Sequence, residues 1–337
     1  MADDKSNHFF RGNLFDLSGK VALVTGGGSG IGLMITQALA SNGARVYVSG
    51  RTASKLDRVV ETHNTPSLPG RIVALPGDVS SKEGVRALHE SFLAREKEQA
   101  RLQKEGGGDD DDDDDAAAVV LDVLVNNAGV ASAKVETDAN ESAEDVRRSL
   151  FEAEQSSFED WNATYNTNVT SGFFVTAAFV PQLQRAGERR KGWSAAVVNV
   201  SSISGLIKHS QKHFAYNASK AAAVHLTRML AAEILDSASS SGSSSGGQGN
   251  SSRFKIRVNG IAPGVFPSEM TAGESGTDQK SDLDAGHFAD RHGGDVPAGR
   301  PGEDRDMAQA VLFVVGCTYL SGQTIVVDGG YTLGAGM

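Results

Sequence analysis

A tyrosine and a lysine four residues apart, Tyr216 and Lys220, are the residues whose types and spacing first suggest chemistry. On a helix such a pair lies on one face, one turn apart. A phenol titrates near pH ~10, and an ammonium group nearby favours the phenolate and lowers that pKa. The pair could give a proton to a carbonyl being reduced or take one from an alcohol. The same spacing arises by chance on many solvated helices, so the surrounding elements must decide its meaning.

A glycine-rich turn near the N-terminus predicts a nucleotide-binding site. It follows an apolar, β-branched run at 20–25 that we interpret as a buried strand. A helical pattern comes next, and a second strand is expected at 45–49. Backbone N–H groups at a helix start can hold a pyrophosphate, and glycine lets the ligand come close. The residues assigned to this role, in the spacing G-x-x-x-G-x-G, are Gly26, Ser29, Gly30, Ile31 and Gly32.

Strands and helices alternate along the remaining chain. Five more strands are expected, at 71–76, 121–125, 195–200, 255–261 and 323–327. Further helices are expected at 81–105, at 158–183 and around Tyr216 and Lys220. This alternation predicts the α/β class, with a Rossmann-type, doubly wound parallel sheet of about seven strands covered on both faces. We interpret residues 1–337 as a single domain.

Two low-complexity inserts, 103–118 and 237–252, interrupt that domain. Their Asp, Ser and Gly residues cannot bury apolar surface, so both are expected to be solvated linkers. A cation or a basic partner for the aspartate run is the alternative. Both inserts lie where a helix returns to a strand, at the edge of the sheet away from the ligand crevice. A polar, Gly-rich segment at about 271–300 is expected to be a mobile flap over the substrate.

The composition narrows the class of protein. Of 337 residues, 39% are hydrophobic, and much of the net charge of −10 comes from the run Asp109–Asp115. No lysine- or arginine-rich stripe suggests nucleic acid, and no His/Cys cluster suggests a metal site. The sequence has no run of 18 apolar residues, so no membrane-spanning helix is expected. A single cysteine, Cys317, and an N-terminus without a signal-peptide core favour a cytoplasmic protein.

The candidate site residues all fall at the carboxyl ends of expected strands. T-G-x-x-x-G-x-G, N-N-A-G, a mid-helix Asn, S-S, Y-x-x-x-K and P-G follow one another in the chain. In these motifs and their order the sequence resembles the short-chain dehydrogenase/reductase family, over roughly residues 17–333. The resemblance implies a carbonyl or alcohol oxidoreductase that uses a nicotinamide cofactor.

The resemblance also implies roles for four catalytic residues. Ser202 would hydrogen-bond the substrate carbonyl, and Tyr216 would supply or remove the proton. Lys220 would hold the nicotinamide ribose and lower the pKa of Tyr216, while Asn168 would hold a water that links Lys220 to solvent.

The position of the serine departs from the family pattern. Ser202 lies fourteen residues before the tyrosine, one more than the family usually has, which implies a one-residue insertion in the loop at 205–214. Ser201 and Ser204 are the alternatives, and their other role would be to hydrogen-bond the local backbone.

The end of the second strand bears on the choice of cofactor. An NAD site usually carries an acidic residue there for the ribose 2′-hydroxyl. This chain has Arg51 instead, which can pair with a 2′-phosphate, so NADPH is expected over NADH. Ser29 stands where NADP-dependent relatives often carry a second basic residue, which tempers that preference. Further cofactor contacts are expected from Asp78, Val79, Asn127, Ala128, Gly129, Tyr216, Lys220, Pro263, Gly264, Val265 and Ser268.

The segment F-P-S-x-M-T at 266–271 looks like a subgroup that includes the 3-oxoacyl reductases of rhamnolipid synthesis. The sequence therefore predicts an NADPH-dependent carbonyl reductase, most like a 3-oxoacyl thioester reductase. An NADP-linked sugar, polyol or gluconate-type dehydrogenase and a non-catalytic nucleotide-binding regulator are the alternatives. The family also implies a homo-oligomer, a tetramer or a dimer. His209, His213 and His287 could line the mouth of the site and are assigned no catalytic role.

Overall fold

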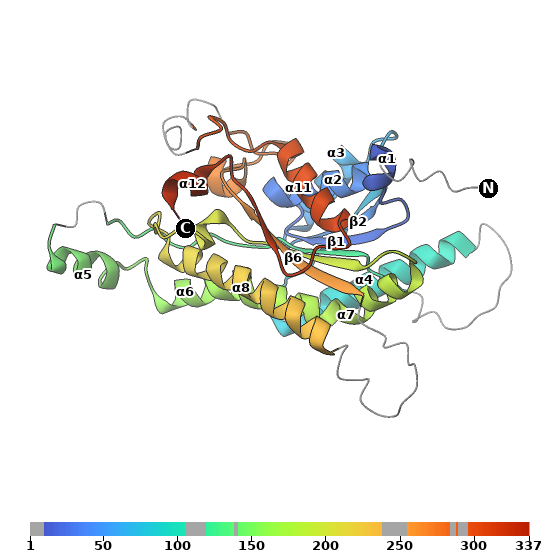
Figure 1. The fold of residues 1–337 in the computed structure, drawn as a ribbon, viewed down its shortest axis with the longest axis horizontal. Helices are drawn as coiled ribbons and strands as arrows, with labels where there is room; N and C mark the ends of the chain where they lie inside the picture. Colours follow the sequence, from blue (N-terminus) through green and yellow to red (C-terminus); the bar gives the residue numbers. More distant parts are fainter. Residues whose placement is uncertain are drawn as a thin grey trace.

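The computed structural model describes residues 10–104, 119–137, 141–237, 255–283, 288 and 296–336. Nearly all of both predicted inserts, part of the predicted flap, and His287 lie outside these ranges. Within them, the chain folds as a parallel sheet with helices on both faces, which confirms the predicted fold class (Figure 1).

Seven parallel strands form one sheet in the order β3-β2-β1-β4-β5-β6-β7. The strands are β1 Val21–Thr25, β2 Arg45–Ser49, β3 Arg71–Ala74, β4 Val123–Asn126, β5 Ala195–Val200, β6 Ile256–Pro263 and β7 Thr324–Val327. Every residue of β1 and β5 is buried, as their unbroken apolar runs predict for strands covered on both faces. The strand order reverses between β1 and β4, which creates the crevice where such sheets bind ligands.

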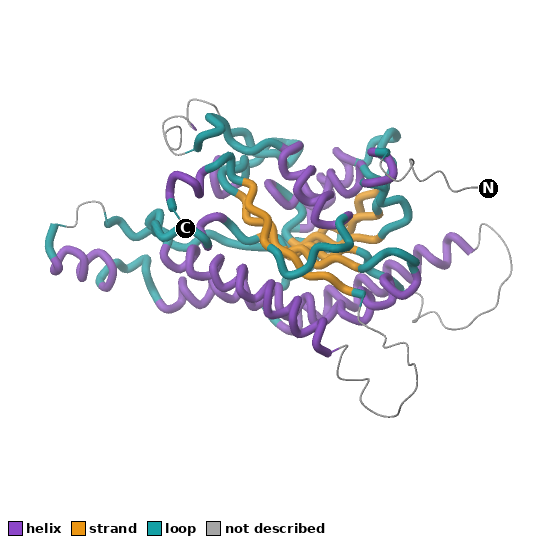
Figure 2. Tube along the Cα trace, viewed as in Figure 1, coloured by secondary structure: helices purple, strands orange, loops and turns teal. Residues whose placement is uncertain are grey.

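Helices cover the two faces of the sheet in two groups, with the strands between them (Figure 2). One face carries α2 Gly30–Ser41, α3 Ala53–His63 and α11 Asp304–Gly316. The other carries α4 Lys82–Lys104, α7 Ser171–Arg189 and α8 Phe214–Ser237. The shorter helices are α1 Arg11–Leu14, α5 Ala143–Phe151, α6 Phe158–Tyr165, α9 Glu269–Ala272 and α12 Tyr331–Ala335. Among the described residues, no helix is long and apolar enough to cross a membrane.

The long helix predicted at 158–183 is present, and it continues to Arg189 with a π-helical turn inside it. Between α6 and α7 the backbone makes a π-helical turn at Asn166–Thr170. Such turns occur mostly as single bulges, frequently at functional sites. Here the turn contains Asn168, whose side chain bonds the backbone of Val130, 38 residues earlier in the chain.

The described part of the predicted flap is held against the body at several points. His63 Nε2 of α3 lies 2.9 Å from the Asp278 carbonyl oxygen, and Lys280 pairs with Asp304 at the start of α11. A hydrophobic cluster separate from the packing of the sheet joins this segment to the residues that follow β5 and to α12. Its members are Ile203, Ile207, Leu283, Phe288, Val296 and Tyr331.

Candidate active site

A cavity of about 150 Å³ opens at the carboxyl ends of the strands, where the order reverses. Six predicted cofactor residues lie in its wall: Gly26, Arg51, Asp78, Val79, Ala128 and Gly129. They come from segments far apart in the chain, and the parallel strands bring them to one edge. The cavity therefore has the position and composition expected of a site for the adenosine part of a dinucleotide.

The glycines of the first turn are required by close contacts. A Cβ at Gly32 would lie 2.1 Å from the Gly26 carbonyl oxygen, and Gly26 itself adopts a φ of +63°. Ser29 precedes α2 in an extended conformation, and its side chain does not cap the helix. The amides of the first turn are thus left for an anion, in keeping with the predicted pyrophosphate site.

The loop after β6 crosses directly over this turn. A Cβ at Gly30 would lie 2.9 Å from the Cβ of Ser268, and one at Gly264 would lie 2.7 Å from the Cα of Asp328. The loop from Pro263 to Ser268 is therefore packed between the glycine turn and the end of β7. This places Ser268, one of the predicted cofactor contacts, beside the predicted pyrophosphate site.

Asn127 ties the end of β4 to the glycine turn. Its Nδ2 donates to the carbonyl oxygens of Gly26, at 2.9 Å, and Thr25, at 3.2 Å. The Thr25 hydroxyl accepts from the amides of Asn127, at 3.1 Å, and Ala128, at 3.2 Å. Asn127 thus shapes the wall of the site from behind. Thr25 shapes the same wall together with Asn127, although the sequence analysis did not select it. Its place immediately before the first glycine of the motif could have indicated this role.

The structure brings Ser202 to Tyr216. Ser202 precedes a short 3₁₀ helix, Ile203–Gly205, and its Oγ accepts from the Ser204 amide at 3.1 Å. Burial raises the pKa of Tyr216, and a hydrogen bond with the Ser202 side chain lowers it by less. The neighbouring Ser201 instead donates to the Ile261 carbonyl at 3.0 Å. Of the three serines considered, Ser202 is the one that meets the tyrosine.

Lys220 does not have the predicted effect on Tyr216. Its Nζ is buried and donates to the Val200 carbonyl at 3.1 Å, with the Tyr216 ring centre 5.5 Å away. Burial lowers the pKa of Lys220 to about 8. Because the ammonium is directed to Val200 and not to the phenol oxygen, burial dominates and the Tyr216 pKa is raised, opposite to the predicted direction.

Asn168 clamps the loop after β4 to α8. Its Oδ1 accepts from the Val130 amide at 2.8 Å, and its Nδ2 donates to the Val130 carbonyl and to Ser219 Oγ, both at 3.0 Å. A Cβ at Gly129 would lie 3.1 Å from Asn168 Oδ1 and 3.6 Å from Lys220 Nζ, so this glycine lets the two groups approach. Both amide hydrogens of Asn168 are donated to protein groups. The predicted relay water would therefore have to bind a different atom of Asn168.

One histidine lies nearer the tyrosine than its assignment suggested. The rings of His213 and Tyr216 have centres 6.4 Å apart, and His213 Nδ1 lies 3.1 Å from the Ser132 carbonyl oxygen. Burial lowers the pKa of His213, which favours the neutral ring. His209 Nδ1 accepts from the Gln211 amide at 3.1 Å, a local backbone contact.

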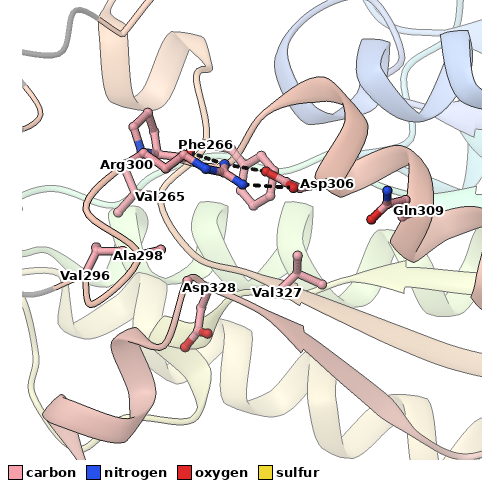
Figure 3. Close-up of a pocket in the computed structure, with 12 residues that line it drawn as sticks. Val265, Phe266, Val296, Ala298, Arg300, Asp306, Gln309, Val327 and Asp328 are labelled. Carbon is pink, nitrogen blue, oxygen red and sulfur yellow. Dashed lines mark hydrogen bonds and ion pairs between the residues drawn. The ribbon is translucent and has the colours of Figure 1, made fainter.

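A second cavity, of about 210 Å³, lies behind the loop after β6 (Figure 3). Val265 and Phe266 form part of its wall, and Arg300 pairs with Asp306 at 2.6 Å beside it. Neither Ser202 nor Tyr216 lines it. Among the described residues, no group of three His, Cys, Asp or Glu side chains could hold a metal ion.

Comparison with known proteins agrees with this geometry. A family model described as short chain dehydrogenase matches residues 20–98 and 115–239, more than half of the chain. The chain belongs to the short-chain dehydrogenase/reductase family. A model described as enoyl-(acyl carrier protein) reductase matches residues 250–332. As a member of this family, the protein is an NAD(P)-dependent oxidoreductase that acts on alcohol or ketone groups.

Curated members of the short-chain dehydrogenase/reductase family match along nearly the whole chain. The short-chain dehydrogenase/reductase PhomF of Diaporthe leptostromiformis is 33% identical over 323 residues, covering 94% of this chain and 93% of PhomF. The rhamnolipids biosynthesis 3-oxoacyl-[acyl-carrier-protein] reductase of Pseudomonas aeruginosa is 31% identical, with 95% and 98% covered. A galactitol 2-dehydrogenase of Cereibacter sphaeroides is also 31% identical, with 95% and 98% covered.

A solved structure of the same family has the same fold. The Pseudomonas aeruginosa RhlG/NADP active-site complex superposes with a TM-score of 0.64 at 29% sequence identity, covering 94% of this chain and 98% of that one.

Proposed function

We propose that this short-chain dehydrogenase/reductase is an NADPH-dependent carbonyl reductase in which Tyr216 protonates the carbonyl oxygen and Ser202 polarises it. The observation that carries the proposal is the meeting of Ser202, Tyr216 and Lys220 at the sheet edge that also bears the dinucleotide cavity.

The hydrogen bonds around Ser202 suit its proposed role. Its Oγ accepts from the Ser204 amide, so its own O–H can donate to a carbonyl oxygen. Such a fixed donor stabilises the charge that develops on that oxygen. The bound nicotinamide would supply the hydride, and the residues of this chain would orient the ketone and deliver the proton.

The electrostatics of Tyr216 and Lys220 favour proton donation. Burial raises the Tyr216 pKa, which keeps the phenol protonated and ready to donate to the forming alkoxide. Lys220, with a pKa of about 8, can exchange protons near neutral pH and so can resupply the phenol. We assign Asn168 the neighbouring place in that relay, because it lies beside Lys220 at Gly129.

Two observations support NADPH over NADH. The exposed Arg51 stands in the cavity wall at the end of β2, and the residues before and after it carry no acidic side chain. A guanidinium there can pair with a 2′-phosphate. The solved RhlG relative is a complex with NADP.

We propose a 3-oxoacyl thioester as the substrate class. The rhamnolipid 3-oxoacyl reductase is among the relatives, and Ile203, next to Ser202 in the chain, belongs to a hydrophobic cluster with Ile207. The galactitol 2-dehydrogenase, at equal identity, favours a sugar or polyol dehydrogenase as the second candidate.

We also propose a homo-oligomer, a tetramer or a dimer, in the cytoplasm. Large apolar side chains are exposed on α6, α7 and α8, where a second copy could cover them: Phe158, Trp161, Phe173 and Met229. The single cysteine suits a reducing compartment. Light scattering that shows a stable, active monomer would contradict the assembly.

The deciding experiment follows the loss of NADPH absorbance. The purified protein is assayed with acetoacetyl thioesters, ketogluconates and simple diketones, each with NADPH and with NADH. Turnover fastest with NADPH and the thioester supports the proposal, whereas turnover with ketogluconates favours the second candidate. NADPH binding without turnover of any ketone would favour a nucleotide-binding regulator.

A further inference from the structure

A chain of hydrogen bonds leads from the C-terminal helix α12 to the proposed catalytic serine. Gln211 Nε2 donates to the Tyr331 hydroxyl at 3.1 Å, and Gln211 Oε1 accepts from the Ser204 hydroxyl at 2.8 Å. The Ser204 amide in turn donates to Ser202 Oγ at 3.1 Å. One carboxamide thus spans from α12 to the 3₁₀ turn that orients Ser202.

The backbone at this carboxamide is unusual. Gln211 has a φ of +50° and Lys212 a φ of +64°, a conformation that side-chain-bearing residues rarely adopt. Two consecutive residues of this kind stand just before α8, and such strain persists only where neighbouring contacts hold it. The Val135 amide donates to the Lys212 carbonyl at 2.8 Å, and Lys212 Nζ pairs with Glu136 at 2.6 Å.

The surroundings make Gln211 the bridge for the Ser204 turn. Ser204 and Tyr331 are buried, so an unpaired hydroxyl on either is unfavourable. A turn of three residues has little internal stability of its own. Its orientation therefore depends on contacts of this kind. Because the Ser204 amide occupies one lone pair of Ser202 Oγ, the orientation of the turn decides where the Ser202 hydrogen points.

We propose that Gln211 is a positioning residue for carbonyl reduction, acting through Ser204 on Ser202. This inference rests on the proposed function. Gln211 has two features that could matter here: its left-handed backbone, and its carboxamide, which holds Ser204 and Tyr331. The proposed role belongs to the carboxamide.

The substitution Gln211→Asn separates these roles. Asparagine suits a left-handed φ better than glutamine, but its side chain is one methylene shorter and cannot span both partners. Gln211→Glu keeps the length, and its carboxylate can accept from both hydroxyls. We expect Gln211→Asn to lower kcat with acetoacetyl-CoA roughly 10-fold while the KM for NADPH stays within about twofold. Gln211→Glu and Tyr331→Phe should lose less.

Gln184→Asn is the matched control, because Gln184 lies on α7 and bonds Glu188 and the Lys255 amide, away from the site. It should leave kcat unchanged. Equal thermal midpoints for the two asparagine variants would exclude a folding defect. Full activity of Gln211→Asn, or an equal loss in Gln211→Glu and Gln211→Asn, would overturn the positioning role.

A second readout keeps the inference apart from the proposed function. The Tyr216 phenol is titrated by ultraviolet difference absorbance, with Tyr216→Phe subtracted, in the parent and in Gln211→Asn. If Ser202 is released, its hydrogen bond to Tyr216 weakens and the titration moves to higher pH. A shift without ketone turnover in the parent would leave the positioning intact and refute the proposed reaction. An unmoved titration would refute the positioning.

Discussion

The Lys220 ammonium lies over the ring of Tyr216, 5.5 Å from its centre, and donates to the Val200 carbonyl instead of the phenol oxygen. Burial therefore decides both pKa values: it raises that of Tyr216 and lowers that of Lys220 to about 8. In a simple pair the tyrosine would be a phenolate and the lysine an ammonium. Here burial favours the neutral phenol of Tyr216 and the neutral amine of Lys220. This arrangement suits a neutral phenol that donates a proton and a lysine that can replace it near neutral pH.

Tyr216→Phe should abolish ketone reduction and spare NADPH binding, because it removes only the hydroxyl that would protonate the substrate. Steady-state kinetics and NADPH fluorescence titration measure the two effects separately. A variant with near-normal kcat would end the proposed mechanism.

Ser202→Ala should mainly lower kcat, whereas Ser201→Ala should mainly lower the stability of the fold. Loss of a fixed donor to a developing oxyanion typically lowers kcat roughly 10²- to 10³-fold, so Ser202→Ala should be severely impaired. The Ser201 hydroxyl donates to the Ile261 carbonyl, which also accepts the Ser201 amide at 2.8 Å. Ser201→Ala should therefore reduce the free energy of unfolding by about 1 kcal/mol and leave kcat nearly unchanged. Urea unfolding and kinetics of both variants test this; the reverse pattern would reassign the catalytic serine.

The sequence predicted the strands well because each is a short apolar run, and the central ones are buried on both faces. All seven are present; the second and fifth have the predicted bounds, and the ends of the others differ by at most two residues. Helices α3 and α11 were not assigned, although α3 has an amphipathic pattern that buries only Leu56 and Val59. The π-helical turn at Asn166–Thr170 could not be predicted, because it accompanies hydrogen bonds between Asn168 and Val130 that the local sequence pattern does not encode.

The sequence predicted which residues meet at the sheet edge better than it predicted how they interact there. The motifs identified residues that parallel strands necessarily bring to one edge, such as Gly26, Arg51 and Asp78. The direction of the Tyr216 pKa was not predictable, because it depends on burial and on where Nζ of Lys220 points. The one-residue insertion expected in the loop at 205–214 stays a prediction; that loop contains the left-handed residues Gln211 and Lys212.

Lys220→Met should stabilise the fold while it abolishes activity. The Lys220 pKa falls from 10.5 in the unfolded chain to about 8 in the fold, so burying the charged form costs stability below pH 8. Between about pH 8 and 10.5 the folded protein has released a proton that the unfolded chain keeps, and the cost fades. The variant should gain up to roughly 3 kcal/mol at pH 7 and little above pH ~10.5. Urea unfolding of the variant and the parent across this pH range measures how the gain in the free energy of unfolding changes with pH. A gain that grows as pH rises would contradict the prediction.

Arg51→Ala should weaken NADPH binding far more than NADH binding. An ion pair to a phosphate contributes roughly 1.5–3 kcal/mol, so the dissociation constant for NADPH should rise roughly 10- to 100-fold. Arg51 is exposed at the cavity wall, so its removal should leave the fold intact. Equal losses for the two cofactors, measured by fluorescence titration, would show that Arg51 does not bind the 2′-phosphate.

Replacing Gly106–Ala117 and Ala238–Ser251 by short turns should leave kcat and KM nearly unchanged. Both segments lie outside the described residues, but the elements that flank them are placed: α8 starts near Tyr216 and ends at Ser237, roughly 30 Å further along its axis at the rise of an α-helix. Likewise α4 ends at Lys104 on the way back to the amino end of β4. Loop-closure entropy grows only with the logarithm of length, so stability should rise slightly at most. Kinetics of the double deletion, with its size by light scattering, test this. A large fall in kcat at unchanged size would show that an insert reaches the active site.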